Sequence, residues 1–86
     1  MEIATLQAFV EVADHASFSE AAESLFLTQP AVSKRVAQLE RELGTRLFDR
    51  IGRRVSLTST GIELLPRARR LINDAREIKR LVSDLS

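Results

Sequence analysis

The 86-residue sequence contains no cysteine, tryptophan or tyrosine, and only one histidine. Without cysteine, this segment has no disulfide, no thiolate metal site and no thiol redox switch, which fits a reducing compartment. The one histidine, His15, has no second His, Cys or acidic cluster at ligand spacing. We therefore expect it to be a surface or capping residue rather than a metal ligand.

Other absences narrow the classes of protein further. There is no apolar run of membrane length and no basic-then-apolar leader, so we expect a soluble, cytoplasmic protein that does not bind membranes. No nucleophile–base pair, metal cluster or glycine-rich phosphate loop is present, so we expect neither an enzyme nor a cofactor in this segment. An apolar content of 44% predicts one small globular domain, whose modest core a partner subunit would help to stabilise.

The net charge of +1 hides an uneven distribution along the chain. Residues 1–27 carry five acidic residues and neither Lys nor Arg, whereas residues 28–59 carry seven cations and three anions. Positive charge therefore begins in the middle of the chain, which suits a polyanion bound at one face.

The stretch from residue 29 to residue 43 predicts a helix around which the other elements are arranged. Thr28 can cap its start, Pro30 lies in the first turn where its missing N–H costs nothing, and Gly44 suits the left-handed position after its end. Its apolar residues recur at helical spacing and predict one buried stripe. They are Val32, Val36, Leu39 and Leu43.

The polar side of the first two turns of this helix carries an amide, a hydroxyl and two cations, in Gln29, Ser33, Lys34 and Arg35. A helix that reads the major groove needs such groups, with its N-terminal turn foremost. Gln29 can pair with an adenine edge, and Pro30 can contact a thymine methyl. An amphipathic helix with a solvated polar face is the alternative, and only the neighbouring elements favour DNA reading.

Two shorter helices are predicted before this one, at residues 2–14 and 18–25. Ser17 begins the second of them in a capping box with Glu20. The connection to Thr28 is very short, and Phe26 occupies a position where many such turns carry glycine. A helix, a tight turn and a capped helix with a polar leading turn form a helix-turn-helix pattern.

Residues 47–50 and 55–58 are short, partly alternating segments that predict a hairpin with a basic tip at residues 51–54. Beside a helix-turn-helix, such a hairpin is a wing. Arg50, Arg53 and Arg54 would then lie along the phosphate backbone, with one of them entering the narrow minor groove. A solvated basic loop is the alternative.

A long final helix is predicted to begin at Thr58 or Thr60 and to bend in its early turns at Pro66. Its apolar residues alternate spacings of four and three, a heptad seam suited to dimerisation. A membrane-surface helix and a core helix of a larger protein are alternatives, but mixed charges and the lack of Trp argue against lipid. The seam comprises Leu64, Ala68, Leu71, Ala75, Ile78, Val82 and Leu85.

The expected fold is therefore mainly α: a winged helix-turn-helix of three helices and a two-stranded wing at residues 1–58, then a linker helix at residues 59–86. The candidate DNA-binding residues are Ser17, Thr28, Gln29, Pro30, Ser33, Lys34, Arg35, Arg50, Arg53 and Arg54. A helical adaptor that uses the heptad seam and binds no nucleic acid is the competing hypothesis, but it leaves the basic wing and polar leading turn unexplained.

These motifs together resemble the N-terminal DNA-binding domain of the LysR-type transcriptional regulators, over essentially the whole chain. The resemblance rests on Ser17 to Ala22, Leu25, Thr28 to Ser33, Leu39-Glu40, Leu43-Gly44, Leu47-Phe48, Arg50, Leu57-Thr58 and Gly61. The sequence departs from many members at Lys34-Arg35, where Arg and a neutral residue are usual, and at Phe26, where His is frequent.

The resemblance implies binding to interrupted palindromes in double-stranded DNA as a homodimer, with linker helices paired antiparallel and tetramers possible in the full-length protein. It also implies that Gln29, Pro30 and Ser33 contact bases and phosphates, and that Arg53 enters the minor groove. A small-molecule inducer would act only through a C-terminal domain that is absent here.

Overall fold

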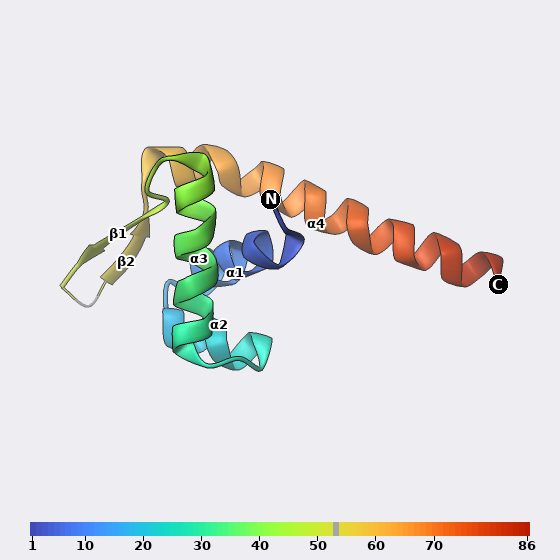
Figure 1. Cartoon of the computed structure of the whole chain (residues 1–86), viewed down its shortest axis with the longest axis horizontal. Helices are drawn as coiled ribbons and strands as arrows, with labels where there is room; N and C mark the ends of the chain where they lie inside the picture. Colours follow the sequence, from blue (N-terminus) through green and yellow to red (C-terminus); the bar gives the residue numbers. More distant parts are fainter. Residues whose placement is uncertain (53) are drawn as a thin grey trace.

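The structure is a computed structural model, and it describes residues 1–52 and 54–86. Helices α1 (Ile3–His15), α2 (Phe18–Leu25) and α3 (Gln29–Leu43) form a compact head. A hairpin of β1 (Phe48–Ile51) and β2 (Arg54–Leu57) projects from one side of the head, and α4 (Ser59–Leu85) leaves on the other side (Figure 1). The expected fold, a mainly α winged helix-turn-helix followed by a long helix, is confirmed.

Capping residues set the starts of α2 and α3, whose bounds agree with the prediction. The Ser17 hydroxyl accepts a hydrogen bond from the amide of Glu20 at 3.1 Å, and the Thr28 hydroxyl accepts one from the amide of Ala31 at 3.3 Å. Each bond satisfies an N–H group that has no partner within its helix. Helix α1 begins and ends one residue later than predicted.

Phe26 ends α2 in a left-handed backbone conformation, with φ of 56° and ψ of 41°. Its amide donates to the carbonyls of Ala22 and Glu23, and its side chain is 95% exposed. Phe26 therefore takes the position that glycine usually fills, and its ring gains little packing in return.

We expect Phe26→Gly to raise the free energy of unfolding by about 0.5–1 kcal/mol, because glycine adopts this conformation without a Cβ penalty. Thermal unfolding measures the gain. Phe26→Ala removes the ring but keeps the strained Cβ, so it should leave stability nearly unchanged. A gain of equal size for both variants would place the cost in the exposed ring instead of the backbone.

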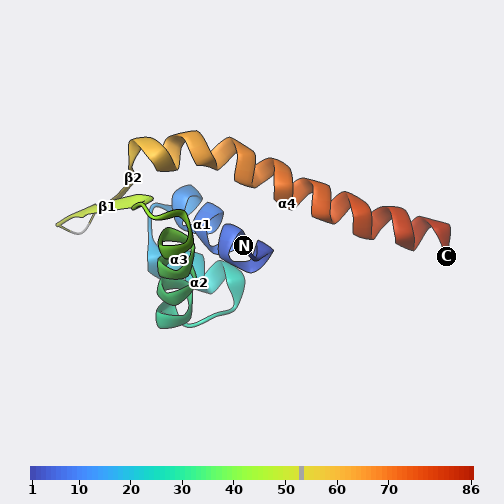
Figure 2. The ribbon, with the colours of Figure 1, turned by 45° about the horizontal axis from the view of Figure 1, so that its top comes forward.

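The core lies where α1 packs against the other three helices. Its largest apolar side chains with no exposed surface are Phe9, Val12, Val32, Leu39 and Leu47. Ala68 and Ile72 of α4 belong to the same buried cluster, so the first turns of α4 complete the head. In Figure 2, this part of α4 lies over α1 and the rest extends past the head.

An ion pair fastens α4 to α1 beside this core. Nη1 of Arg69 donates to Oδ2 of Asp14 at 3.1 Å, and Nη2 donates to Oδ1 of the same carboxylate. This hydrogen bonding raises the pKa of Arg69. Both side chains are partly exposed, so the pair orients α4 more than it stabilises the fold.

The two strands of the hairpin lie closer to its tip than predicted. Their register pairs Phe48 with Leu57 and Ile51 with Arg54, so residues 51 and 54 belong to the ladder and not to the loop. Leu47 and Thr58, predicted as strand ends, instead join the hairpin to the helices. The Leu47 amide donates to Oε2 of Glu40 at 2.7 Å, and its carbonyl accepts from the Thr58 amide at 3.0 Å.

Thr58 is the residue that caps α4, so the alternative start at Thr60 is wrong. Its hydroxyl accepts from the amide of Gly61 at 3.1 Å and donates to the carbonyl of Arg46 at 2.8 Å. Gly61 then packs directly on the chain before the hairpin. A Cβ at this position would overlap the carbonyl oxygen of Leu47 and lie 2.9 Å from Cδ2 of Leu57.

We expect Gly61→Ala to lower the free energy of unfolding by about 1–3 kcal/mol, because the added methyl meets backbone that cannot move freely. At about 4–8 °C per kcal/mol for a domain of this size, thermal unfolding detects the change easily. Thr60→Ala, one residue earlier on the exposed side of the same turn, is the matched control and should be close to neutral. Equal stability of the two variants would contradict the close approach of Gly61.

Helix α4 continues through Pro66 to Leu85. Among the residues that the structure describes, no helix has the length and apolar content needed to cross a membrane.

Candidate nucleic-acid interface

Helix α3 buries one side in the head and exposes its leading turns. Val32, Val36 and Leu39 are buried against α1 and α2. At about 100° per residue, Pro30 and Lys34 fall on the opposite side of the helix, and both are exposed. The N-terminal turn of α3 lies at the end of the head farthest from α4 in both views (Figures 1 and 2).

Arg41 continues the line of Pro30 and Lys34 along the exposed side of α3, and the sequence reasoning missed it. Its position could have been found, because it lies close to two full turns after Lys34 on the same helical face. The exposed side of α3 therefore carries a second cation near its C-terminal end.

Gln29 and Ser33 lie on the side of α3 that faces the hairpin. The Ser19 hydroxyl donates to Oε1 of Gln29 at 3.3 Å, which joins the first turns of α2 and α3. A shallow groove of about 250 Å³ runs between these turns and the hairpin. Its lining includes Ser17, Ser19, Gln29, Arg50 and Arg54. The structure thus brings candidate residues from three elements to one groove.

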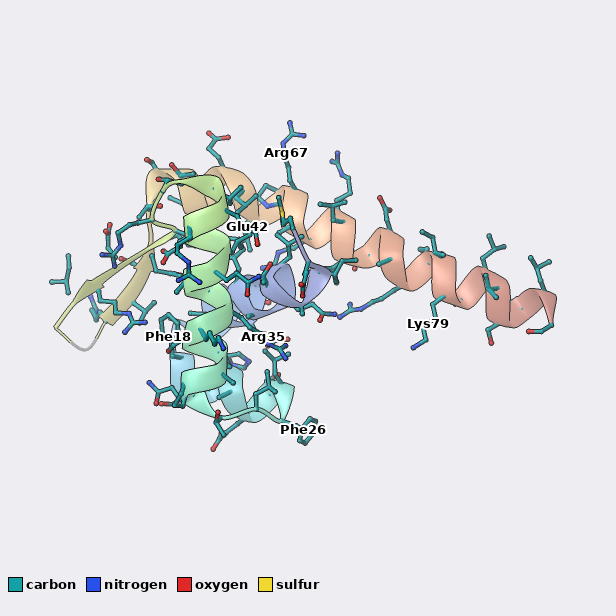
Figure 3. The ribbon with its side chains drawn as sticks, viewed as in Figure 1. Phe18, Phe26, Arg35, Glu42, Arg67 and Lys79 are labelled. Carbon is teal, nitrogen blue, oxygen red and sulfur yellow. The ribbon has the colours of Figure 1, made fainter. Side chains whose placement is uncertain are left out.

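Arg35 is not part of this surface. The prediction that it shares the polar leading face with Gln29 and Ser33 is wrong, because it lies roughly 160° around α3 from Ser33. In Figure 3, Arg35 extends from the side of α3 away from the hairpin, the same side as Glu42. There, Oε2 of Glu42 forms an ion pair with the N-terminal ammonium group of Met1 at 3.3 Å. This side of α3 therefore faces the start of α1.

Arg50 and Arg54 are exposed on the hairpin, at its border with the groove. The guanidinium carbon of Arg50 lies 4.1 Å from the centroid of the Phe18 ring, so this cation is held against α2. Arg53, the predicted minor-groove residue, lies outside the described residues. Ile51, next to the tip, is 76% exposed.

The cations of this surface are available to a ligand. Across residues 1–52 and 54–86, the ion pairs join Met1 to Glu42, His15 to Glu11, Arg69 to Asp14 and Arg80 to Glu77. None of these uses a cation of α3 or of the described part of the hairpin. Lys34, Arg41, Arg50 and Arg54 are exposed and therefore present their charge to solvent, as phosphate binding requires.

A second exposed surface runs along α4. Its large apolar residues have exposed fractions between 52% and 78%. They are Leu71, Ile78, Leu81, Val82 and Leu85. They form a stripe beside the face that packs on the head.

This stripe lacks three residues of the predicted seam, Leu64, Ala68 and Ala75, and it adds Leu81. Ala68, assigned to dimerisation, is fully buried in its own head, so its side chain is not available to a partner helix. Ile72, which the heptad spacing omitted, fills the next turn of the same buried face. Leu64 and Ala75 are partly buried at the border between the two faces.

Comparison with known proteins identifies the fold. A family model described as bacterial regulatory helix-turn-helix protein, lysR family, matches residues 3–62. The chain belongs to this family of LysR-type regulators. The match spans α1, the helix-turn-helix, the wing and the start of α4.

Two relatives illustrate the similarity among LysR-type regulators. An HTH-type transcriptional regulator in the ibpB-leuC intergenic region of Azotobacter vinelandii is 54% identical over the whole chain, and this chain covers 60% of its length. The SDS degradation transcriptional activation protein of a Pseudomonas strain is 44% identical over 98% of the chain, which covers 28% of that protein. The chain thus spans only part of the length of these relatives.

Solved structures of such domains on DNA have the same fold. The BenM DNA-binding domain in complex with catB site 1 DNA superposes with a TM-score of 0.93 at 32% identity, covering 99% of this chain and 96% of that one. The CbnR DNA-binding domain in complex with DNA superposes with a TM-score of 0.88 at 32% identity, and both chains are fully covered.

Proposed function

We propose that this chain binds an interrupted palindrome in double-stranded DNA as a homodimer and serves a LysR-type transcriptional regulator in the cytoplasm. The observation that carries the proposal is the groove that Gln29 and Arg50 line together: the exposed leading turns of α3, with Lys34, lie beside a hairpin whose described cations have no acidic partner. In this arrangement the N-terminal turns of α3 enter the major groove, and the wing lies along the adjacent backbone and minor groove.

The side chains divide between base reading and phosphate binding. Gln29 carries an amide that can pair with both N6 and N7 of adenine, and Pro30 offers an apolar surface to a thymine methyl. Ser17, Ser33, Lys34, Arg50 and Arg54 supply hydroxyl and cationic donors to phosphates, and Thr28 presents the N-terminal turn of α3 to the DNA. We assign Arg53 to the minor groove from the family resemblance alone.

The exposed stripe of α4 supports the homodimer. Ile78 lies midway between Leu71 and Leu85, so an antiparallel pair centred on Ile78 places Leu71 of each helix opposite Leu85 of the other. Such a pair covers apolar residues that are more than half exposed in the single chain. It also relates two heads by a two-fold axis, which matches a palindrome. Inducer binding and tetramer contacts are proposed to lie outside these 86 residues.

Selection from a random pool of short duplexes, repeated across a salt series, tests the proposal. We expect the bound fraction to converge on two inverted half-sites separated by a fixed spacer, with affinity falling steeply as salt rises. A single half-site without a mirror copy would contradict the dimer. Failure to enrich any sequence at low salt would contradict sequence-specific DNA binding and favour an adaptor that uses α4.

A further inference from the structure

The Arg50 guanidinium lies over an aromatic ring that is itself buried. Phe18, whose ring centroid is 4.1 Å from Cζ of Arg50, is only 6% exposed. Its edge meets the ring of Phe48 at a centroid distance of 5.9 Å and an interplanar angle of 69°. Phe48 in turn contacts Phe9 at 5.4 Å. The Phe18 ring therefore forms a buried support for a surface cation, whereas Phe9 packs only against Phe48 behind it.

The position of this support matters because it joins the wing to the helix-turn-helix. Phe18 is the first residue of α2, directly after the capping Ser17, and Arg50 lies in β1. In Figure 3, Phe18 lies between α3 and the hairpin. Both residues line the groove that Gln29 and Ser19 also border. The guanidinium is thus held at the border between the two proposed DNA-binding elements.

Stacking leaves the hydrogen-bonding capacity of Arg50 intact. A ring that covers one face of a guanidinium does not block its N–H groups, because these lie in the plane of the group. They can still form a bidentate pair of hydrogen bonds with a phosphate. No carboxylate of the described residues lies within ion-pair distance of Arg50. A free arginine side chain loses rotamer entropy when it is fixed, and a stacked one has lost part of that entropy before DNA binds.

We propose that Phe18 is the positioning residue for Arg50: its ring holds the guanidinium in the orientation in which it binds one DNA phosphate at the edge of the groove. This inference rests on the proposed DNA-binding function. It assigns to a buried aromatic residue a part in DNA affinity that is separable from its part in folding.

A double-mutant cycle on the selected duplex separates these two parts. Arg50→Gln removes one phosphate contact from each head, so the slope of log K against log salt should become shallower by about 0.9 per head. Phe18→Leu and Arg50→Lys keep the charge but lose the stacking. Each should lower affinity by about three- to tenfold with little change in slope. Phe18→Leu combined with Arg50→Gln should bind no more weakly than Arg50→Gln alone.

Phe9→Leu is the matched control, because Phe9 packs on Phe48 and has no contact with Arg50 among the aromatic interactions of the described residues. It should lower thermal stability as Phe18→Leu does, yet leave DNA affinity unchanged at temperatures where both variants are folded. The NMR readout on the wild type keeps the role of Phe18 testable even if Phe18→Leu folds poorly.

The NMR signal of the Arg50 Hε proton gives a second readout that needs no DNA. Ring current from Phe18 should shift it upfield in the wild type and in Phe9→Leu, but not in Phe18→Leu. Additive losses in the cycle, or an unshifted Hε signal in the wild type, would overturn the role of Phe18 and leave the proposed DNA binding standing. A wild type that selects no DNA would overturn both.

Discussion

Replacing Ile78 by aspartate is expected to convert the proposed dimer into monomers. Ile78 is 65% exposed in the single chain and lies at the centre of the exposed stripe of α4. In an antiparallel pair the two Ile78 side chains lie near the two-fold axis, so the substitution places two carboxylates together in an apolar seam. Losing the burial of each Ile78 side chain weakens the free energy of dimerisation by about 1.5–3 kcal/mol. Bringing two like charges together weakens it further.

Because the Ile78→Asp variant loses the dimer, its affinity for the operator should also fall. Two linked heads engage a palindrome with an affinity that exceeds that of one head by about 100-fold or more, and this gain disappears when the heads separate. Analytical ultracentrifugation gives the oligomeric state, and fluorescence anisotropy compares the full palindrome with a single half-site. The variant should bind both duplexes with similar, weak affinity.

Asn73→Asp provides the matched control, since it adds the same charge to α4 on a face away from the stripe. Asn73 lines the cleft between α4 and α1, together with Asp14 and Arg69. The Asn73→Asp variant should remain dimeric and bind the palindrome as the wild type does. A dimeric Ile78→Asp variant, or equal loss for both substitutions, would show that the exposed stripe is not the dimer interface.

Gln29→Ala is expected to weaken the free energy of binding to the cognate sequence by about 1–3 kcal/mol for each half-site. It should also relax the base preference at one base pair. The reason is that bidentate hydrogen bonding between the amide and adenine depends on the base, whereas phosphate contacts do not. Competition between the cognate duplex, single-base variants and random DNA measures both effects. The salt slope should stay unchanged, because Gln29 carries no charge.

Gln38→Ala is the comparison for this substitution. Gln38 lies on the same helix but near its C-terminal half, where its amide donates to Glu42 at 3.5 Å. We expect it to have little effect on affinity or on base preference. Equal losses on cognate and random DNA for Gln29→Ala would remove the base-reading role from this residue and leave it a phosphate or structural contact.

The helix-turn-helix could be predicted closely because its signals are local. Thr28 and Gly44 mark the two ends of α3, and the apolar spacing from Val32 onward predicts the helix between them. Ser17 marks the start of α2 in the same way. The strands of the hairpin were misplaced by one residue because short strands have weak local preferences. Their register depends on how Leu47 and Thr58 connect to Glu40 and Arg46.

The errors within the candidate surfaces have a different cause. Arg35 was grouped with Lys34 because they are adjacent in sequence, although a step of about 100° separates neighbours on a helix. Ala68 fitted the heptad spacing, but spacing does not reveal whether the head or a second helix covers a residue. The stacking of Arg50 on Phe18 joins elements far apart in the chain, so no local pattern indicates it.

The placement of these surfaces on DNA is the central claim, and tethered cleavage tests it directly. The chain has no cysteine, so single variants Gln38→Cys on α3, Ile51→Cys at the wing and Glu63→Cys on α4 can each carry a DNA-cleaving chelate. On the selected palindrome, the first should cut within the major groove of each half-site, the second in the neighbouring minor groove, and the third hardly at all. Cleavage mainly from Glu63→Cys, or one set of cuts without its mirror image, would contradict the account.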